Sequence, residues 1–453
     1  MRPIFSRILL MAVAFVGSMS LSAQEDTTQA TNDDDKQKIT IDAQLMSRGE
    51  LRRGGLPSDD YNKDDNEAHF VFERTRMTLG YEKSIISAKV TARHQGIWGM
   101  ENGGSFEIYE AWAQLKAKNG LFTRIGRQEL VYDDERILGN NDWSMAAMTH
   151  DVLKVGFENY GHKFHAIFAY NQNSKNVNGG NYYTDGSQTY KTMQTAWYHY
   201  DVPKIPIGVS LIFMNVGLQA GTPNDYSTVS QQIYGGYLTF KPKNFVLEAA
   251  YYRQGGKSFA DYKDVVETDY SQLRLLPLKA WMASVKASYD FSPQVTAYAG
   301  YDYLSGDKEF IVPGEGSIGL VQHKESSAFT SIFGSSHKFY GAMDFFFVSA
   351  YYASFSPGLQ TLYAGSIFKP LKGLTIDASY KYLAITSALS NVKKTLGHEI
   401  ELSASYQFAK DAKLSLGYSF MKGSETMERL KRSTEKRKLN WAWLMLSFSP
   451  RLL

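Results

Sequence analysis

Residues 398–413, "HEIELSASYQFAKDAK", decide the fold, because they combine a two-faced strand with a very tight turn. Apolar side chains occupy every second position from Ile400 to Phe408, and the positions between them, such as Glu399 and Glu401, are polar. Successive side chains of a strand point to opposite sides, so the pattern predicts a strand with one apolar and one polar face. The short polar run 409–413 predicts a turn directly after that strand.

The same two patterns recur along the chain from residue 39 onward. Segments such as "SAKVTARHQ" (87–95) and "LTIDASYKY" (374–382) alternate apolar and polar side chains. Very short connections predict tight turns at 81–84, 117–120, 158–161, 202–206, 241–244, 291–294, 369–373 and 409–413. Longer connections rich in Gly, Asn and Asp lie between them, for example at 172–190, 217–230, 254–276, 305–357 and 422–437.

Tight turns that alternate with long loops predict an all-β fold class: a transmembrane antiparallel β-barrel of about eighteen strands, with short periplasmic turns and long extracellular loops. Eight turns and nine loops would connect eighteen strands and leave both chain ends on the periplasmic side. Tyr, Phe and Trp near the strand ends are expected where a barrel meets the two membrane interfaces. The alternative is a large soluble all-β protein, a propeller or tandem sandwiches, but the sequence contains no blade-type repeat.

The composition excludes several functions. Among 453 residues, 49 Lys and Arg stand against 46 Asp and Glu, and the formal net charge of +3 gives no reason to expect a nucleic-acid partner. The absence of cysteine excludes disulfides, thiolate metal sites and cysteine nucleophiles. Residues 1–23 are predicted to be a signal peptide, because basic residues at the start precede a short apolar run that small residues follow. We expect 24–38 to be a disordered periplasmic lead-in and 39–453 to be a single outer-membrane barrel domain.

Six stretches carry a resemblance to a known family and are spread over most of the chain after residue 69. They are "FVFERTRMTLGYE" (70–82), "YEAWAQLK" (109–116), "RIGRQELVYDDERILGNNDWSMAAMTHD" (124–151), "SGDKE" (305–309), "FGSSHKFYGAMDFF" (333–346) and "LGHEIELSASYQFAKDAKLSLGYS" (396–419). In these motifs the sequence resembles the alginate-export family of outer-membrane porins. The resemblance implies an eighteen-stranded barrel that acts as a passive, selective channel. In the protein that gives the family its name, a polyuronate passes through a lumen rich in arginines.

Because alternate residues of a strand face the same side, which we call strand parity, a set of charged residues is assigned to a water-filled lumen. A basic group lies on consecutive strands, and an acidic group lies further round the wall. The predicted lumen and substrate-path residues are Arg74, Arg76, Lys89, Arg93, Glu110, Lys116, Arg124, Lys154, Asp377, Glu399 and Glu401. Opposite charges across a narrow pore create a transverse field, which would select and guide anionic or polar solutes. Alternatively, these charges pair with one another, as expected for any water-filled barrel.

The loop after residue 128 offers two other kinds of site. Asp133, Asp134 and Glu135 are a weak calcium-site candidate, because Ca²⁺ prefers clustered oxygen ligands, although their spacing matches no recognised calcium loop. His150 and Asp151 resemble an acid–base pair, but neighbours on a strand point to opposite faces and cannot easily orient each other. We therefore expect no catalytic residues, no enzymatic activity and no cofactor.

Two further features concern the mouth of the barrel. Arg127 and Glu129 have the parity opposite to the lumen residues, which predicts positions near the rim. The connection 305–357 is far longer than usual and contains "HKFYGAMDFFF" (337–347), which is too apolar for open water. It either folds inward and narrows the pore, or it forms an outer cap or a surface that binds a partner.

The sequence thus predicts a monomeric channel in the outer membrane of a Gram-negative bacterium, in contact with outer-membrane lipid. It would pass polar or anionic solutes passively, and an acidic (uronate) polysaccharide or oligosaccharide is one such solute. Two alternatives stay open: a surface-binding or adhesion barrel with a closed lumen, and an outer-membrane barrel hydrolase. The identity of the solute and the direction of net transport do not follow from the residues.

Overall fold

The structure is a computed structural model that describes residues 36–53, 67–101, 103–171, 190–221, 226–260, 274–307, 325–346, 356–388, 393–431 and 438–453. The chain divides into Met1–Gln37 and Lys38–Leu453, and the described secondary structure belongs to the second unit. The predicted signal peptide and almost all of the predicted lead-in lie outside the described residues, so both stay predictions.

Alternating apolar and polar residues form strands throughout the described chain. The strands are β1 (Lys38–Arg53), β2 (Glu67–Lys83), β3 (Ile86–Ile97), β4 (Ser105–Lys116), β5 (Leu121–Gln128), β6 (His150–Asn159), β7 (His162–Tyr170), β8 (Thr192–Asp201), β9 (Ile207–Gly221), β10 (Tyr226–Phe240), β11 (Phe245–Ala260), β12 (Arg274–Pro277), β13 (Ala280–Ser292), β14 (Val295–Leu304), β15 (Leu359–Phe368), β16 (Leu374–Ala384), β17 (Thr395–Ala409), β18 (Ala412–Gly423) and β19 (Lys438–Phe448). Two short helices are η3 (Ser336–Lys338) and α2 (Glu425–Lys431). Within the described ranges, none of the helices is long and apolar enough to cross a membrane.

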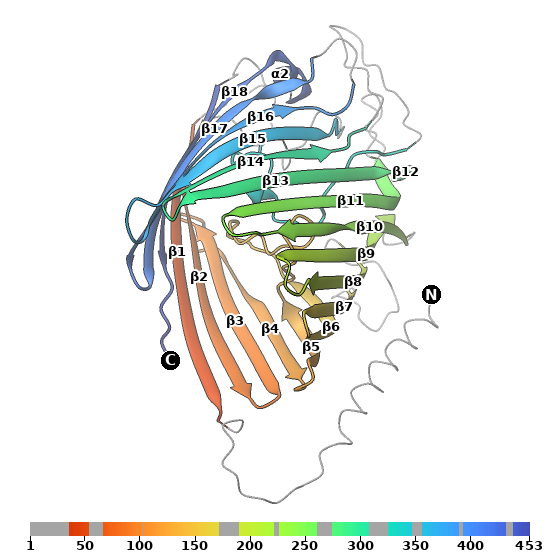
Figure 1. The fold of residues 1–453 in the computed structure, drawn as a ribbon, viewed down its shortest axis with the longest axis vertical. Coiled ribbons are helices and arrows are strands. Elements are labelled where there is room, and N and C mark those ends of the chain that lie inside the picture. The colour runs from red at the N-terminus through yellow and green to blue at the C-terminus, as the bar shows by residue number, and fades with distance from the viewer. Residues whose placement is uncertain are drawn as a thin grey trace, which may run out of the picture. The chain divides into compact units, whose positions relative to one another are not determined.

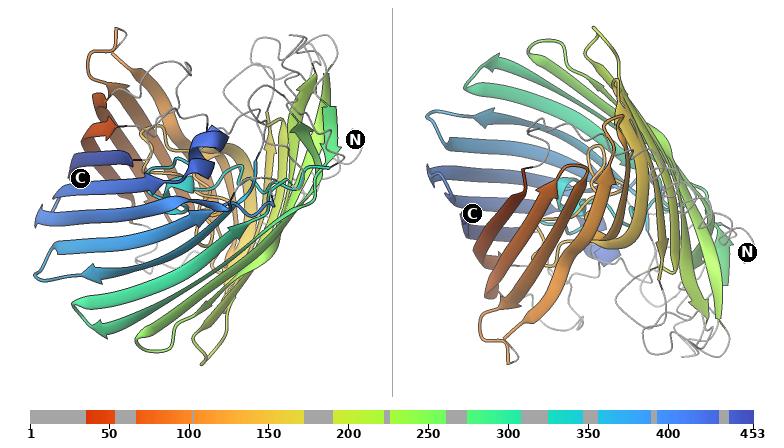
Figure 2. Two further views of the ribbon diagram at one scale, coloured as in Figure 1. Left: turned by 90° about the horizontal axis from the view of Figure 1, so that it is seen from above. Right: turned by 90° about the horizontal axis from the view of Figure 1, so that it is seen from below.

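The strands form one closed sheet. Each strand of the wall pairs antiparallel with its neighbours, and β1 pairs with β19 to complete the circle. The four-residue β12 pairs with the end of β11, whose main partner is β13, so eighteen strands of the described chain make up the wall. Figures 1 and 2 show the strands following one another around the barrel. The predicted fold class, an antiparallel barrel of eighteen strands, is confirmed.

The two faces of the strands have opposite environments. On β17, Ile400 and Leu402 are 47% and 48% exposed, whereas Glu399 is completely buried. On β2, Met77 is exposed and Arg74 is buried. Apolar residues on the outside and charged residues on the inside reverse the arrangement of a soluble protein, and they are typical of a barrel surrounded by lipid.

The tight turns agree closely with the sequence pattern. All eight coincide with short connections between strands, and those at 117–120, 202–206, 241–244 and 369–373 match residue for residue. Two predicted long loops are wrong in extent: for 217–230, β9 continues to Gly221 and β10 begins at Tyr226, and for 254–276, β11 continues to Ala260. Gly and Asn suggested loops there, but backbone pairing between the strands continues whatever the side chains are.

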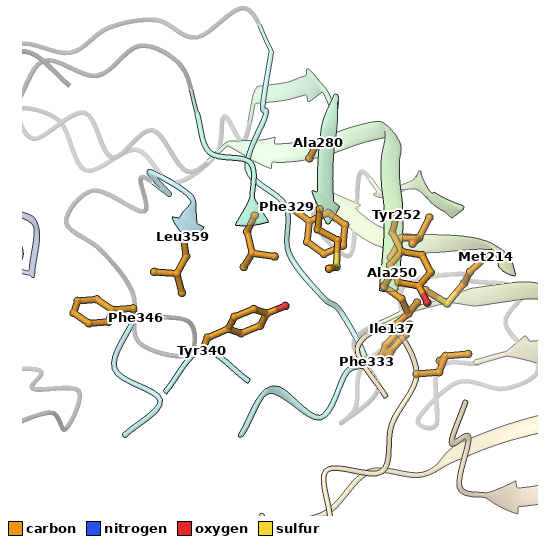
Figure 3. Packing of buried hydrophobic residues seen from close by; sticks show 14 of the residues in the cluster. Ile137, Met214, Ala250, Tyr252, Ala280, Phe329, Phe333, Tyr340, Phe346 and Leu359 are labelled. Atoms are coloured by element: carbon orange, nitrogen blue, oxygen red, sulfur yellow. The ribbon is translucent and has the colours of Figure 1, made fainter. Parts of the chain in front are cut away.

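A hydrophobic cluster lies inside the barrel at the end where the long connections are. Phe329, Phe333 and Phe346, from the connection between β14 and β15, belong to it together with wall residues such as Tyr252 and Met214 (Figure 3). The apolar part of that connection is therefore enclosed by the wall. Residues 308–324 and 347–355 of the same connection lie outside the described residues.

Candidate functional site

Two connections enter the barrel and meet inside it. We call 129–149, between β5 and β6, the first inward segment, and 325–346, between β14 and β15, the second inward segment. They run side by side, and the Gly139 N–H donates a hydrogen bond to the Phe333 carbonyl over 2.8 Å. A Cβ atom on Gly334 would collide with the backbone of the first inward segment, so glycine permits this close approach.

Arg136 fastens both inward segments to the wall. Its guanidinium group donates to Asp134 over 2.7 Å, to Asp302 of β14 over 2.8 Å and to the Tyr340 hydroxyl over 3.0 Å. Burial lowers the pKa of Arg136, but attraction by Asp302, Tyr340 and Asp134 outweighs burial and holds that pKa well above its ordinary value. Burial raises the pKa of the Asp134 carboxyl. Removing one partner of such a buried, paired charge is costly, so this cluster determines where the segments lie.

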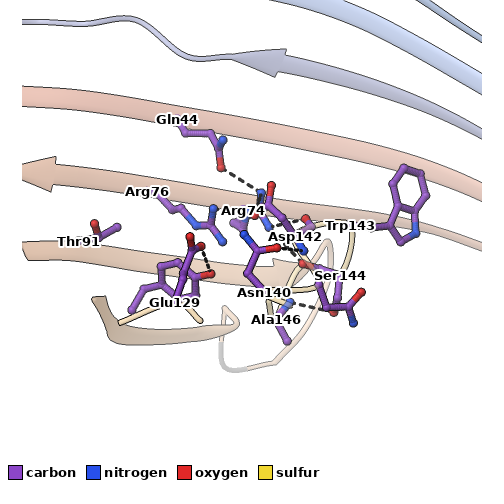
Figure 4. Close-up of polar contacts among 12 residues, drawn as sticks. Gln44, Arg74, Arg76, Thr91, Glu129, Asn140, Asp142, Trp143, Ser144 and Ala146 are labelled. Carbon is purple, nitrogen blue, oxygen red and sulfur yellow. Dashed lines mark hydrogen bonds and ion pairs between the residues drawn. The ribbon is translucent and has the colours of Figure 1, made fainter. Parts of the chain in front are cut away.

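Arg74 and Arg76 of β2, both predicted to line the lumen, hold the first inward segment (Figure 4). The Asp142 carboxylate accepts a hydrogen bond from Arg76 over 2.8 Å and lies 3.1 Å from Arg74. Arg74 also donates to the carbonyl oxygens of Asp142 and Ser144 and to the side-chain oxygen of Gln44. The structure therefore places these two arginines inside the barrel, but their charge is used to bind the segment.

An aromatic cluster fastens the first inward segment near the junction of β1 and β19. The Trp143 ring stacks on His337 of the second inward segment, with centroids 4.4 Å apart, and meets Trp443 edge to face at 4.9 Å. Arg48 donates to the Trp143 carbonyl over 2.8 Å, and its guanidinium carbon lies 4.1 Å from the centre of the Trp143 ring. Sequence reasoning missed this cluster, and a lone tryptophan in a charged loop was the signal that could have indicated it.

Arg76 and Arg93 lie over the same ring, that of Tyr109, at 4.1 and 4.4 Å from its centre. Arg93 pairs with Glu107 over 2.6 Å, and the Tyr109 hydroxyl donates to Glu129 over 2.5 Å. Glu129 follows the last residue of β5, so the alternation of the strand does not apply to it, and its position near the rim stays a prediction. Among the described residues, two nitrogens of Arg76 and two of Arg93 are buried without a hydrogen-bond partner.

The other basic residues predicted to face the lumen have neighbours that bind or surround them. Lys89 pairs with Glu110, Lys116 with Glu158 over 2.8 Å, and Arg124 with the side-chain oxygen of Gln114 over 2.9 Å. Lys154 is buried next to Arg124, its register partner on the adjacent strand. Most of these cations are thus bound within the wall, and their part in selecting solutes stays a prediction.

A polar cavity of about 540 Å³ lies between the inward segments and the wall from β11 to β19. Asp377 and Glu401, from the predicted acidic group, line it, and Glu401 also pairs with Lys381. Glu401 and the buried Glu399 accept backbone N–H groups of the second inward segment over 2.7 and 3.1 Å. These carboxylates therefore hold the second inward segment above the cavity.

Charged residues of both signs line this cavity. They are the acidic residues Asp134, Glu248, Asp302, Asp377 and Glu401, and the basic residues Arg136, Lys286, Lys338 and Lys381. A second cavity, of about 350 Å³, is lined by Asp142, Trp143, Lys410 and Lys413 among others, and it adjoins the turn between β17 and β18. The second cavity therefore extends from the first inward segment to the end of the barrel where the tight turns lie.

The three acidic residues considered as a calcium site point to different partners. Asp133 accepts a hydrogen bond from the Trp197 indole over 3.2 Å, Asp134 binds Arg136, and Glu135 pairs with Lys338. Asp133 and Glu135 both have a positive φ, 53° and 70°, which turns the backbone between adjacent side chains. In the part of the chain that the structure describes, no three His, Cys, Asp or Glu side chains are grouped to hold a metal ion.

His150 and Asp151 point away from each other on β6. His150 is buried, with its Nδ1 atom 2.9 Å from the Tyr190 hydroxyl. Asp151 accepts two hydrogen bonds from Arg127, over 2.8 and 2.9 Å, and both side chains are partly exposed. The geometry separates the two residues that had resembled an acid–base pair.

A different group contains the residue types of a hydrolytic triad, and sequence reasoning missed it because its members lie on two strands. His199 lies 2.8 Å from the Ser210 hydroxyl and 3.0 Å from the Asp201 carboxylate. Ser210 is 1% exposed, and its hydroxyl also bonds Asp133 of the first inward segment. A nucleophile must reach its substrate, so the burial of Ser210 argues against a catalytic role.

No protein-family model matches the sequence, and no curated protein matches it. Solved structures match the fold. OccAB1 of Acinetobacter baumannii has a TM-score of 0.60 and 11% identity, and the match covers 95% of this chain and 100% of that chain. OccK2 (OpdF) of Pseudomonas aeruginosa in complex with glucuronate has a TM-score of 0.54 and 13% identity, with 92% and 98% covered. A BenF-like porin from Pseudomonas fluorescens Pf-5 has a TM-score of 0.56 and 12% identity, with 91% and 99% covered.

At these identities the likeness shows the fold alone, and the fold is that of outer-membrane porins. It agrees with the porin part of the resemblance found in the sequence. Membership of the alginate-export family stays a prediction.

Proposed function

We propose that this protein is an outer-membrane channel through which small polar solutes diffuse passively. The observation that carries the proposal is the polar cavity beneath the inward segments, inside a closed barrel with an apolar outer face. Segments that narrow a water-filled barrel limit the size of the solute, and the charges on the wall determine its preference. Such a channel needs neither catalytic chemistry nor an energy source.

The dimensions favour a small solute over a long polymer. The cavity of about 540 Å³ lies within the range of about 300–1,000 Å³ that small-molecule sites occupy. A threading chain would have to separate the inward segments from Asp302, Arg76 and Glu401. Export of an acidic polysaccharide, which the alginate-export resemblance implies, is therefore the less favoured alternative, whereas a single uronate such as the glucuronate bound by OccK2 satisfies the size limit.

The two sides of the lumen differ in charge. Arg76 and Arg93 supply positive charge on one side, although their guanidinium nitrogens without partners are buried, and Asp377 and Glu401 line the cavity on the other side. Because Arg76 already forms an ion pair with Asp142, we favour the cavity side as the path of the solute. We therefore expect a weak preference for cations instead of the preference for anions that the arginines suggested from sequence.

Single-channel recording in planar lipid bilayers tests the proposal. The refolded protein should give discrete, persistent conductance steps, and the reversal potential under a salt gradient should report the ion preference. A preference for anions that disappears in Arg93→Gln would place the route on the arginine side. A barrel that never conducts would overturn the channel and favour the surface-binding or adhesion barrel with a closed lumen.

A hydrolase is the second candidate, favoured by the group of His199, Ser210 and Asp201. If the protein is a hydrolase, the refolded protein should release fatty acid or peptide from lipid or peptide substrates, and Ser210→Ala should abolish that release. We expect no release, because the Ser210 hydroxyl is covered by the first inward segment.

The proposed location is the outer membrane of a Gram-negative bacterium, with lipid around a monomeric barrel. Exposed apolar residues on the outer face, including Leu79, Ile125 and Leu416, support contact with lipid, and the predicted signal peptide supports export. Recovery of the protein in the outer-membrane fraction tests the location. The size of the protein in detergent tests the oligomeric state.

A further inference from the structure

We propose that the cavity beneath the inward segments binds an amino sugar, meaning a polyhydroxylated ring with a protonated amine. This inference rests on the proposed channel function and names the class of solute. Three features of the lining carry it: a carboxylate without an ion-pair partner, hydroxyl groups near that carboxylate, and aromatic rings that line the same cavity.

Asp377 of β16 is the carboxylate without an ion-pair partner. It accepts a hydrogen bond from the Tyr298 hydroxyl over 2.7 Å, and among the described residues it forms no ion pair, although Lys381 and Lys286 attract it from a greater distance. The neighbouring lysines have other partners, since Lys381 pairs with Glu401 and Lys286 lies 4.0 Å from Glu248. An unpaired carboxylate in a partly enclosed, water-filled cavity attracts a protonated amine.

Hydroxyl groups line the cavity beside this carboxylate. Ser284, Ser379 and Ser403 belong to the lining, together with the hydroxyls of Tyr298 and Tyr363. A hydroxyl both donates and accepts hydrogen bonds, so such a lining matches a ligand that is itself rich in hydroxyls. Carboxylates add strong acceptors for the hydroxyl donors of a sugar.

Aromatic rings supply the apolar part of the site. Trp443 and Phe339 line the cavity, from β19 and from the second inward segment. Trp443 packs over Gly417, where a Cβ atom would collide with the indole ring, so the ring lies close against the wall. The C–H face of a sugar ring can pack against such an aromatic surface while its hydroxyls reach the polar lining.

A uronate fits this cavity less well than an amino sugar. Lysines also line the cavity, but Lys286, Lys338 and Lys381 already face Glu248, Glu135 and Glu401. The carboxylate of a uronate would add a negative charge near Asp377 and Glu401, and like charges at close range are disfavoured. A neutral sugar avoids that repulsion but leaves Asp377 without a cation. The charge of the lining therefore ranks the three classes, with the amino sugar first and the uronate last.

Uptake into proteoliposomes tests the ranking, with labelled glucosamine, glucose and glucuronate at a slightly acidic pH that keeps the amine protonated. We expect glucosamine to enter about threefold faster than glucose, a factor that one partly exposed charge contact can support, and glucuronate to be slowest. Asp377→Asn should remove the advantage of glucosamine over glucose, and Asp377→Glu should retain it. Glu73→Gln, which changes a carboxylate that bonds the exposed Trp98, should leave the ranking unchanged.

The outcomes separate this inference from the proposed function. Equal uptake of the three sugars, or fastest uptake of glucuronate, in a protein that conducts would overturn the amino-sugar site and leave the channel standing. Absence of both conductance and uptake would overturn the channel itself. Gel mobility before and after heating shows whether Asp377→Asn folds. If it does not fold, the sugars are tested as blockers of the ion current through the wild-type channel. Stronger block by glucosamine would support the site, and stronger block by glucuronate would refute it.

Discussion

The carboxylate of Asp142, in the first inward segment, lies 2.8 Å from the guanidinium group of Arg76 on β2. The same carboxylate lies 3.1 Å from Arg74, whose side chain is completely buried. One acidic residue of a loop thus neutralises two arginines of the wall. The position of the first inward segment at this level therefore depends in part on this carboxylate.

Asp142→Ala should release the first inward segment and increase both the conductance and its fluctuations. Removing one partner leaves Arg74 buried without its anion, which costs up to about 3–5 kcal/mol at a fully buried site. Because Asp142 is 46% exposed, we expect about 1–2 kcal/mol of the free energy of unfolding to be lost. Single-channel recording and urea titration measure the two effects.

Asp151→Ala is the matched control, because it removes a carboxylate that binds an arginine on the partly exposed outer side of β5 and β6. Its conductance should equal that of the wild type. If the two variants conduct alike, Asp142 does not control the width of the lumen.

Trp143→Ala should disconnect the first inward segment from the junction of β1 and β19. The substitution removes the stacking on His337, the edge contact with Trp443 and the cation–π contact with Arg48. A fully buried tryptophan costs about 3–5 kcal/mol on truncation, and we expect about 2 kcal/mol for this partly exposed ring. Urea titration measures the loss, and Trp98→Ala, at an indole that is 63% exposed, should cost much less. Equal losses would argue against the cluster as an anchor.

The pH dependence of stability should respond to Asp133. Burial raises the pKa of this carboxyl, although hydrogen bonds from Ser210 and Trp197 oppose the shift. A raised pKa means that the contribution to stability is present at low pH and is lost as the pH rises through that pKa. Asp133→Asn should therefore be at least as stable as the wild type near neutral pH, with an advantage that shrinks toward acidic pH. Urea midpoints across this range test the prediction, and a deficit that is constant at every pH would contradict it.

Local sequence patterns predicted the wall well because each strand alternates independently of the others. The alternation from Glu399 to Phe408 identifies the outer face of β17, and the tight polar turn after it fixes where the next strand begins. From such segments the strand number and the direction of Arg74 or Glu399 follow without any knowledge of distant contacts. The extent of β9 and β11 did not follow, because backbone pairing continued through residues that favour loops.

The interior arrangement depends on contacts between residues far apart in sequence, and periodicity carries no information about these. Asp142 meets β2, Arg136 meets Asp302, and Ala342 donates to Glu401. The alternation of β5 also ends at Gln128, so it could not predict that Glu129 bonds Tyr109. The arginines were correctly recognised as unusual, but sequence could not show that the protein itself supplies the anion for two of them.

Gly334→Ala should separate the two inward segments without removing any charge. A Cβ atom at this position would collide with the backbone oxygen of Arg136, and the backbone offers no flexible side chain that could move aside. The segments would have to shift apart, which disturbs the hydrogen bond between Gly139 and Phe333 and the approach of Arg136 to Asp302. We expect a larger and noisier conductance, together with about 1–3 kcal/mol less stability, the usual cost of forcing atoms into a packed interior. Gly49→Ala is the control, because a Cβ on that strand glycine meets open space, and its channel should behave as the wild type does. A normal conductance in Gly334→Ala would show that close contact between the inward segments does not set the width of the pore.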